Sequence, residues 1–582
     1  MLNGEELNSV TLNEGAAAPG NSEPHPDPDP LPIVPGHAYY WRLELLVGDD
    51  DRSDWLYGKP STDRERGAAG LCDFTLHIPE DQGAYDPQTW RGKRVRLNYV
   101  STDMAGETVS RRRFTGWIIT PSWDGTRRLV SCQCSDRQQQ RVEGMSIEQI
   151  NALTPGAIWS EDVFSPIEGR SRWEYLQERL STLPASVDAD ANGQLRLTSW
   201  FRSAPDWHFG PDTMLYDTAT HTYADLDQLT NVFEVTVSVR FTRLRQLNKS
   251  YYWQHLDTAG QTGMPGFCVW RGNSGDLPNV EMVQAAVDGS GQTLLNPNWY
   301  RLPPTTPNPC GTGAPWINRY YPALLLGGSW IGARRWSQTV TETYTLRLEA
   351  SASIAESGEV FGRDSTSYEV ESERPAKWES DPITDGISGH EDVTDEPRRQ
   401  LALRCMLARG SVEIIRAHNQ TLITWSEPTS FVTGVELGQT LFIEDQGYRA
   451  VGRCCRIVDE FDLAKAPITT LTIALIRLGG EVSDPLTPPP HSIEPQPEPE
   501  APDPIARSMP TQMGGRPGTP AYDDDADGFS GQYDNFTPGL EEFPRRFQVT
   551  ATEIDAALRD ELKVAIAATY RVSAASDLLE VS

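Results

Sequence analysis

The order of apolar and polar residues predicts β-strands over much of the chain. The alternation is clearest in two blocks, Tyr39 to Val142 and Val412 to Leu478, which are separated by more than two hundred residues. In the first block, Asp124-Gly125 lies between two alternating runs, and in the second, residues 444–447 separate two further runs. Both have the pattern of a tight β-hairpin. We therefore predict two compact β units, and their spacing indicates a duplicated barrel.

Three helices are predicted from start and stop signals. Ser146 and Ser171 each precede a Gln or Glu by three residues, which is the spacing of a capping box. Thr394 or Asp395 can cap a third helix, Pro397 suits its first turn, and Gly410 suits its end. This third helix leads directly into the second β block.

The region between the blocks contains two further strand patterns. Alternation over residues 229–249 and 340–348 predicts long strands. The stretch between them is rich in Trp, Pro and Gly. Exposed tryptophans in loops can bind sugar rings, whereas buried ones pack irregular loops into a core, and both interpretations stay open here. The tryptophans concerned are Trp253, Trp270, Trp299, Trp316, Trp330 and Trp336.

The two ends of the chain differ from the middle. A Leu-Asn pair recurs every five residues from Leu2-Asn3 and runs into a Pro-rich stretch, so an extended tail is predicted there. A Pro-rich acidic linker follows the second β block. Near the C-terminus, Thr550 and Glu553 form a capping box, and apolar residues at four-residue spacing predict an amphipathic helix. Those apolar residues are Ile554, Leu558, Leu562, Ile566 and Tyr570.

These patterns divide the chain into seven segments. They are an extended N-terminal tail (1–36), a first β-barrel (37–145), a small α+β domain (146–215), a strand- and Trp-rich middle region that contributes to an inserted domain and to the second barrel (216–410), the closing strands of that barrel (411–480), a Pro-rich acidic linker (481–545) and a C-terminal amphipathic helix (546–582). The predicted fold class is mainly β with α+β insertions.

Charge narrows the range of functions. The 582 residues include 51 basic and 82 acidic ones, for a formal net charge of -31. Stable binding to a phosphate backbone needs clustered Lys and Arg, so the charge argues against a nucleic-acid-binding protein. A negative surface would suit a wall past which DNA slides without binding, but solubility is the more ordinary explanation of the charge. The start lacks a secretory pattern and no apolar run approaches roughly 18 residues, so we expect a cytoplasmic protein without a transmembrane segment.

Few residues form a pattern with known chemistry. One run fits a calcium loop, with Asp523, Asp525 and Asp527 at positions one, three and five, Gly528 at six and Asp534 at twelve. The helices that flank such loops are missing, and a solvated acidic run in a linker explains the same residues. Calcium is the only cofactor that the sequence indicates.

No motif of a known enzyme class is present. HExxH and GxSxG are missing, the histidines have no i,i+4 pairing, and the eight cysteines include no CxxC pair. An acidic glycosidase would use two carboxylates about 5 to 10 Å apart, which a sequence cannot place, and a secreted one would need a signal. We therefore expect a protein without enzyme activity.

Several stretches resemble the tail hub proteins of long-tailed bacteriophages. In the first half these are Phe114-Thr115-Gly116 and residues 134–142, 172–175 and 180–186, and in the second half residues 333–342 and 437–461. The resemblance extends from His37 to Gly480. It leaves out the Pro-rich ends and much of the Trp-rich middle.

The resemblance implies a homotrimer in which each chain supplies two tail-tube-like β-barrels. Three chains would form a six-barrel ring that joins the six-fold tail tube to the distal tip and forms part of the DNA exit channel. Implied partners are a distal tail or tail tube protein, a tape measure protein, and central fibre or receptor-binding tip proteins, while DNA passes only transiently. The protein would be assembled in the bacterial cytoplasm and belong to the virion tail tip. A receptor- or glycan-binding β protein of the same tip is the alternative.

Overall fold

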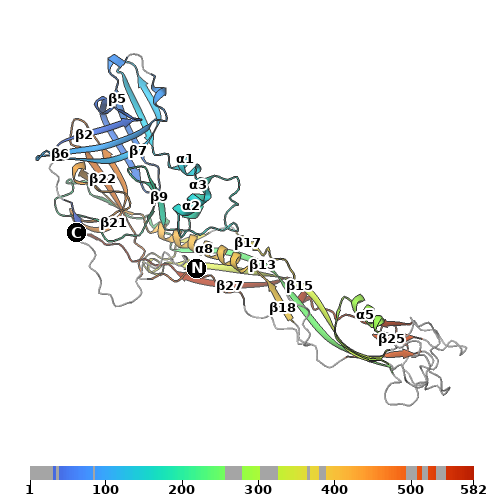
Figure 1. The fold of residues 1–582 in the computed structure, drawn as a ribbon. Coiled ribbons are helices and arrows are strands. Elements are labelled where there is room, and N and C mark those ends of the chain that lie inside the picture. The colour runs from blue at the N-terminus through green and yellow to red at the C-terminus, as the bar shows by residue number, and fades with distance from the viewer. Residues whose placement is uncertain are drawn as a thin grey trace, which may run out of the picture.

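The computed structural model describes most of the chain between the N-terminal region and the C-terminus. The described residues are 30–33, 38–82, 86–255, 278–301, 325–363, 367–378, 389–480, 482–492, 507–513, 522–531 and 545–582. They form several sheets with few helices, so the mainly β class is confirmed. Figure 1 shows a head that holds two sheets and a long arm that leads away from it.

The first sheet is built from one continuous stretch of sequence. Its strands pair antiparallel in the order β4-β5-β8-β7-β6-β2. They are β2 (Ala38–Val47), β4 (Leu56–Glu65), β5 (Leu71–His77), β6 (Arg94–Asp103), β7 (Thr108–Asp124) and β8 (Leu129–Ser135), with β3 (Asp50–Asp51), η1 (Ser53–Trp55), η2 (Glu80–Gln82) and η3 (Pro87–Trp90) in the connections. β7 and β8 form the hairpin predicted at Asp124-Gly125. Apolar residues of β2, β5, β6, β7 and β8 share one core, so the sheet curls around it.

The second sheet gathers strands from distant parts of the chain. They are β1 (Leu31–Pro32), β11 (Trp207–Phe209), β12 (Thr220–Thr222), β19 (Thr421–Pro428), β20 (Thr440–Asp445), β21 (Tyr448–Glu460), β22 (Ile468–Leu475) and β28 (Leu579–Val581), with η4 (Leu226–Gln228) and η6 (Thr429–Phe431) nearby. The predicted hairpin around residues 444–447 is confirmed, and Gln446 and Gly447 have positive φ there. This sheet surrounds its own core, which includes Trp425 and Phe209.

The two sheets are joined edge to edge, because β21 pairs antiparallel with β4. Through this pairing, the two sheets form one continuous sheet of 15 strands. Among the strands that the structure describes, no pairing closes either sheet into a complete ring. The observed units are therefore curled sheets around separate cores.

A small α+β unit lies beside the head. It contains α1 (Gln138–Glu143), α2 (Ile147–Leu153), α3 (Arg172–Leu180) and the hairpin of β9 (Ala185–Ala189) and β10 (Leu195–Ser199). Both predicted helix starts are confirmed. Ser146 and Gln149 make a complete capping box, and the Ser171 side chain accepts from the Glu174 N–H.

The arm is a long antiparallel hairpin. β13 (Val232–Gln254) pairs along its whole length with β15 (Leu325–Glu349), and at about 3.3 Å per residue it spans ~75 Å. Shorter strands line its two edges: β14 (Thr293–Arg301), β16 (Phe361–Arg363), β17 (Tyr368–Glu371), β18 (Gly389–Val393), β23 (Arg507–Met509) and β27 (Leu562–Arg571). Helix α7 (Ser351–Ser357) follows β15. Both long strands were predicted, but β13 starts after residue 229 and ends beyond residue 249, and β15 starts well before residue 340.

Each end of the arm has its own apolar core. Near the head, α8 (Glu396–Ala417) packs on β13 and β15. At the far end, which we call the tip, α5 (Val280–Gly289) and aromatic residues form a second core. The tip also holds the small sheet of β24 (Thr511–Met513), β25 (Gly528–Gly531) and β26 (Arg546–Gln548), and Figure 1 shows α5 and β25 there.

Helix α8 starts where predicted, with Asp395 as its cap, but it does not end at Gly410. A Cβ at position 410 would lie 2.6 Å from Phe233 Cδ1 and 2.8 Å from Leu348 Cδ1. The glycine therefore allows the helix to approach the arm closely. A glycine inside a helix costs only about 1 kcal/mol, which such packing can offset, so the predicted stop is wrong.

The predicted helix in residues 546–582 is also wrong. Within the described residues 545–582, α9 (Ala556–Arg559) is the single helical turn, and β27 is a strand that pairs parallel with β15. Leu562, Ile566 and Tyr570 are spaced by four residues, which fits the strand period of two as well as a helix. The open edge of β15 supplies the hydrogen-bonding partners, and this tertiary pairing decides the outcome.

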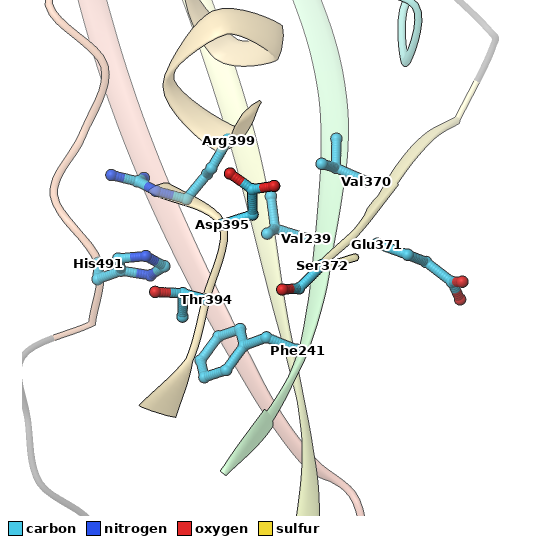
Figure 2. Close-up of a pocket in the computed structure, with 9 residues that line it drawn as sticks. All are labelled: Val239, Phe241, Val370, Glu371, Ser372, Thr394, Asp395, Arg399 and His491. Atoms are coloured by element: carbon cyan, nitrogen blue, oxygen red, sulfur yellow. The ribbon is translucent and has the colours of Figure 1, made fainter. Parts of the chain in front are cut away.

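The Pro-rich segment predicted as a linker makes fixed contacts where it is described. Residues 482–492, which we call the strap, lie against the arm, and Figure 2 shows His491 beside Arg399 and Thr394. Further along, β23 to β26 belong to the arm and tip. The Leu-Asn repeat lies outside the described residues. In the part of the chain that the structure describes, no helix is long and apolar enough to cross a bilayer.

Candidate functional site: the junction between the two sheets

The junction between the two sheets begins with a β-bulge in β7. Leu97 on β6 pairs with Phe114, whereas the next residue, Asn98, pairs with Arg112. Arg113 is thus an extra residue without a partner on β6. A bulge of this kind redirects a side chain, and here the guanidinium of Arg113 points toward the second sheet.

Arg113 forms a bidentate ion pair with Asp459 of β21. Arg113 Nε donates to Asp459 Oδ2 at 2.9 Å and Nη2 donates to Oδ1 at 2.6 Å, and both side chains are fully buried. Thr62 and Thr469 each donate a hydroxyl to the same carboxylate at 2.7 Å. Arg113 Nη1 also donates to the carbonyl of Thr433 at 3.3 Å. The carboxylate therefore receives four hydrogen bonds from β7, β4 and β22.

Burial opposes the charged forms of both partners, but their mutual interaction is stronger. The pKa of Asp459 is lowered despite burial because Arg113 attracts and hydrogen-bonds the carboxylate. The pKa of Arg113 is raised for the same reason. Removing one partner of a buried pair leaves an uncompensated charge, which typically costs about 3–5 kcal/mol. Moving one sheet relative to the other would separate the two charges, so the pair stabilises one relative position of the sheets.

An apolar side chain crosses the same junction. Phe461 follows β21 in the second block but is fully buried in the core of the first sheet. Its ring stacks against Tyr99 of β6, with the centroids 6.2 Å apart. The second block therefore supplies both a charged and an apolar anchor to the first.

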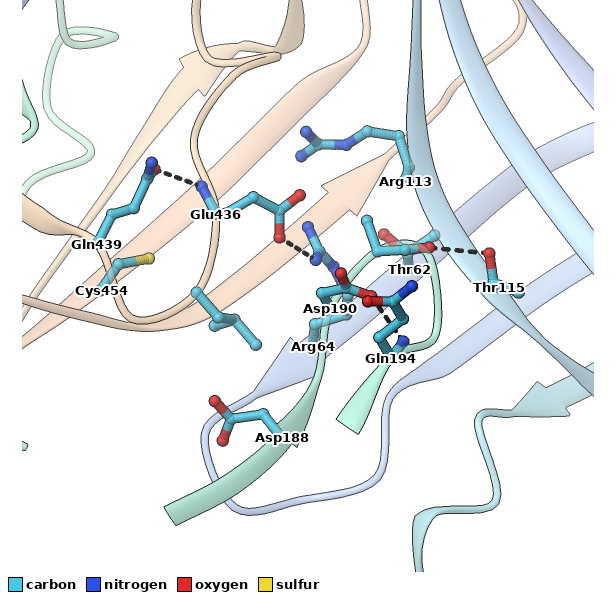
Figure 3. A network of polar contacts seen from close by, with 12 residues as sticks. Thr62, Arg64, Arg113, Thr115, Asp188, Asp190, Gln194, Glu436, Gln439 and Cys454 are labelled. Atoms are coloured by element: carbon cyan, nitrogen blue, oxygen red, sulfur yellow. Dashed lines mark hydrogen bonds and ion pairs between the residues drawn. The ribbon is translucent and has the colours of Figure 1, made fainter. Parts of the chain in front are cut away.

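The small α+β unit attaches beside these anchors, and Figure 3 shows the polar groups around Arg113 and Arg64. Arg64 of β4 donates to Glu436 at 2.7 Å, which links β4 to the loop before β20. Thr115 of β7 donates to the carbonyl of Ala191 in the β9–β10 turn at 2.9 Å. The junction thus binds the two sheets of the head and the α+β unit together.

Gly116 lies in the Phe114-Thr115-Gly116 stretch of β7. A Cβ at this position would lie 2.5 Å from the Phe114 ring and 2.6 Å from the Ser135 carbonyl oxygen. Close approach of β8 to β7 therefore requires glycine. Phe114-Thr115-Gly116 is one of the stretches that resemble phage tail hub proteins, and the packing of β7 on β8 explains its glycine.

An exposed ion pair also crosses the junction, between β21 and β4. Arg456 of β21 donates to Asp63 of β4 at 2.6 Å and 3.0 Å, and the two side chains are 46% and 34% exposed. Exposed pairs of this kind contribute about 0–1 kcal/mol. The pair offers a matched comparison for Arg113 and Asp459.

One buried acid of the second sheet lacks such compensation. Glu427 of β19 is fully buried, and neither carboxyl oxygen makes a hydrogen bond of good geometry, although the Trp425 side chain lies near enough to favour the ionised form. Burial, with repulsion from Asp445, raises the pKa of Glu427 to about 8. The group is therefore neutral at neutral pH, as expected for a carboxyl in apolar surroundings.

The predicted calcium loop is only partly described. Asp523 Oδ1 accepts from the Asp525 N–H at 3.0 Å, and Asp527 Oδ1 accepts from Thr550 at 2.8 Å. Among the described residues, no group of three or more His, Cys, Asp or Glu side chains could hold a metal ion. Asp534 lies outside those residues, so the calcium loop stays a prediction.

Of the tryptophans named above, Trp253, Trp299 and Trp330 belong to the tip core, whereas Trp336 of β15 is half-buried and donates its Nε1–H to the Leu558 carbonyl at 2.9 Å. Trp253 and Trp330 are buried, and Trp299 packs against Trp330 with ring centroids 5.5 Å apart. These two buried rings cannot stack on a sugar. Trp270 and Trp316 lie outside the described residues.

Sequence reasoning missed the junction residues. Arg113 and Asp459 are 346 positions apart, so no local motif connects them. A signal was present, because alternation along β21 places Asp459 on the core side between Ile457 and Phe461. A charge at such a position needs a buried partner.

Comparison with known proteins finds no matching family model and no matching curated protein. Solved structures do match. The 43 kDa tail protein of prophage MuSo2 from Shewanella oneidensis has a TM-score of 0.33 and 13% identity, over 75% of this chain and 98% of that chain. The chain is structurally similar to phage tail proteins.

Two further matches have the same general coverage. The tail protein from Neisseria meningitidis MC58 has a TM-score of 0.33 and 10% identity, over 75% of this chain and 97% of that chain. An E. coli component of the type VI secretion system, described as similar in structure to the T4 bacteriophage tail proteins gp27 and gp5, has a TM-score of 0.24 and 8% identity. That match covers 77% of this chain and 81% of the other.

Proposed function

We propose that this protein is a structural hub of a bacteriophage tail tip. The observation that carries the proposal is the junction. One chain contains two curled sheets with separate cores, and the buried pair of Arg113 and Asp459, together with Phe461, fixes their relative position. In a ring of such chains, each chain would supply two segments of the ring's wall, one from each sheet, at a constant spacing. We call these the wall segments.

The sequence resemblance supports the same function. It extends from His37 to Gly480, and therefore includes β2 to β8 and β19 to β22, which form most of the two sheets. A hub of this kind is a homotrimer, so three chains would present six wall segments to the six-fold tail tube. The two sheets take the place of the two tail-tube-like barrels that the resemblance implies.

The remaining parts of the chain have roles that follow from their positions. The head would contact the tail tube or distal tail protein, and the arm would lead toward the central fibre, the tape measure protein or the receptor-binding tip proteins. The net charge of -31 would keep DNA from binding as it passes through the ring. In this proposal the protein resides in the virion tail tip and has no enzyme activity.

Native mass spectrometry of the purified full-length chain tests the proposal. Trimers are expected, and electron microscopy with the tail tube protein is expected to show rings. The Asp459→Asn variant should lose ring formation, because the spacing of the wall segments is no longer fixed, whereas Asp63→Asn should retain it. A protein that stays monomeric with the tube protein present, or that hydrolyses polysaccharide, would contradict the proposal.

A further inference from the structure

The strap follows the arm through a series of specific contacts. Asp484 forms an ion pair with Arg571 of β27 at 3.1 Å, and the Tyr570 hydroxyl donates to the carbonyl of Thr487 at 2.7 Å. Pro488 and Pro489 are buried. The strap is therefore docked on the arm up to its last described residues.

His491 is the last ionisable group of the docked strap. Its Nδ1 lies 2.8 Å from Glu342 Oε2 on β15, and its Nε2 lies 2.8 Å from Glu396 Oε2 at the start of α8. The Glu342 side chain is only 2% exposed, and its other oxygen accepts from the Ser492 N–H at 3.0 Å. The imidazole thus stands between two carboxylates, one of which is buried.

The groups around His491 are mostly acidic. Asp395 and Arg399 line the small pocket beside it, together with the ring of Phe241. Glu371 also lines the pocket, but Figure 2 shows its carboxylate pointing away from His491, and it pairs with Arg240 at 3.4 Å. Arg399 is turned toward Glu396, to which it donates at 2.6 Å and 2.7 Å. The same guanidinium donates to the Tyr344 hydroxyl at 3.0 Å and to the Pro489 carbonyl at 2.8 Å. Apart from His491, Arg399 is the one cation among the described residues that line the pocket.

Both carboxylates are held in the ionised form. The hydrogen bonds from Arg399, followed by Gln400, lower the pKa of Glu396 to about 2. Burial raises the pKa of Glu342, but the hydrogen bonds from His491 and Tyr344 outweigh it, and the pKa ends below its usual value. His491 therefore faces two negative charges over the ordinary pH range.

We propose that His491 is a pH-sensitive latch, which holds the strap on the arm as an imidazolium and releases it when the ring loses its proton. An imidazolium donates its Nδ1–H to Glu342 and holds its positive charge 2.8 Å from the Glu396 carboxylate, although Nε2 is not aligned for a hydrogen bond there. A neutral imidazole has only one N–H, so the other ring nitrogen presents a lone pair to a carboxylate at 2.8 Å. The contact that stabilises the strap at low pH then becomes repulsive as the pH rises.

This latch does not depend on the proposed tail function. It concerns the route of the chain from the second sheet to the tip, because β23 of the tip follows the strap in sequence. When the latch is closed, the strap and β27 lie together on the arm. When it opens, the Pro-rich segment loses its attachment to Glu342 and Glu396.

Hydrogen–deuterium exchange of the full-length protein at about pH 6 and about pH 9 tests the latch, with rates corrected for the intrinsic effect of pH. Pro488, Pro489 and Pro490 have no amide hydrogen, so the probes are the amides of Leu486, Thr487, His491 and Ser492. In the natural protein, these amides are expected to lose at least ~10-fold of their protection at the higher pH. His491→Gln should leave them weakly protected at both values. His491→Lys retains a positive charge and should keep them protected at both.

A matched control uses a histidine that lies elsewhere in the fold. His77 is exposed at the end of β5, so His77→Gln should behave as the natural protein does. The amides of α8 serve as an internal control for folding and should stay protected in every variant. The proposal is overturned if the natural strap is equally protected at both pH values, or if His491→Lys releases the strap in parallel with the natural protein.

Discussion

The two sheets of the head have similar cores but are assembled in different ways. The first sheet comes from residues 38–135 without interruption, so its strands pair with near neighbours in sequence. The second sheet combines β1, β11 and β12, the β19 to β22 stretch, and β28 at the C-terminus. Closing such long loops costs chain entropy before any contact forms. The comparison teaches that the second sheet is assembled from the whole length of the chain, whereas the strands of the first come from one stretch and its core takes Phe461 from outside that stretch.

The largest expected effect is at the buried ion pair that joins the sheets. Asp459→Asn removes the charge that compensates Arg113 and is expected to lower the free energy of unfolding by about 3–5 kcal/mol. Urea denaturation measures this loss, and hydrogen exchange shows whether the second sheet opens before the first. Asp63→Asn, which removes the exposed pair at the same junction, should cost no more than about 1 kcal/mol. If the two variants lose the same free energy of unfolding, the buried pair does not stabilise the junction more than the exposed pair does.

A comparable effect is expected from the apolar anchor. Phe461→Ala leaves a cavity in the core of the first sheet and is expected to cost about 3–5 kcal/mol. Although Phe461 belongs to the second block in sequence, exchange should increase most in β5, β6 and β7. If only β19 to β22 lose protection, the first sheet does not depend on the second block.

A smaller effect on stability, which depends on pH, is expected at Glu427 in the core of the second sheet. Folding raises the pKa of Glu427 from 4.5 to about 8, so its contribution to stability is fully present below pH 4.5 and is lost as the pH rises toward 8. Glu427→Gln cannot ionise and should stabilise the second sheet by a few kcal/mol at about pH 9, with little change at about pH 4. Thermal unfolding of both proteins over this range measures the difference. If the stability of the variant and that of the natural protein change in the same way with pH, Glu427 is not kept neutral in the folded protein.

The smallest expected effect concerns the calcium loop in the tip. If Asp523, Asp525, Asp527 and Asp534 bind calcium, a saturating concentration should stabilise the tip by roughly 1–3 kcal/mol. Replacing Asp523 and Asp527 by Ala should abolish that increase in heat stability. An increase that persists in the double variant, or no increase in the natural protein, would refute the loop.

The sequence predicted the parts of the fold in which local signals and tertiary contacts agree. Both β blocks, the hairpins at Asp124-Gly125 and residues 444–447, and the capped starts of α2, α3 and α8 were found because turn and capping residues act within a few positions. The strands β11, β12 and β28 were missed. Each has only three residues, which is too short for a period of two to be recognised.

The junction and the C-terminal strand show why the rest could not be predicted. Arg113 and Asp459 are brought together by a bulge and a strand pairing that no local pattern reports. The apolar spacing of β27 fits a helix and a strand equally, and the exposed edge of β15 decides between them. In each case the deciding partner is far away in sequence.

The central claim is that each chain supplies two wall segments in a fixed arrangement to a threefold ring. A cryo-electron microscopy reconstruction of the protein assembled with its tail tube partner tests this claim most directly. The account predicts three copies whose first and second sheets alternate around one lumen, six in all, with the pair of Arg113 and Asp459 intact in each copy. A ring in which only one of the two sheets faces the lumen, or an assembly without a lumen, would contradict it.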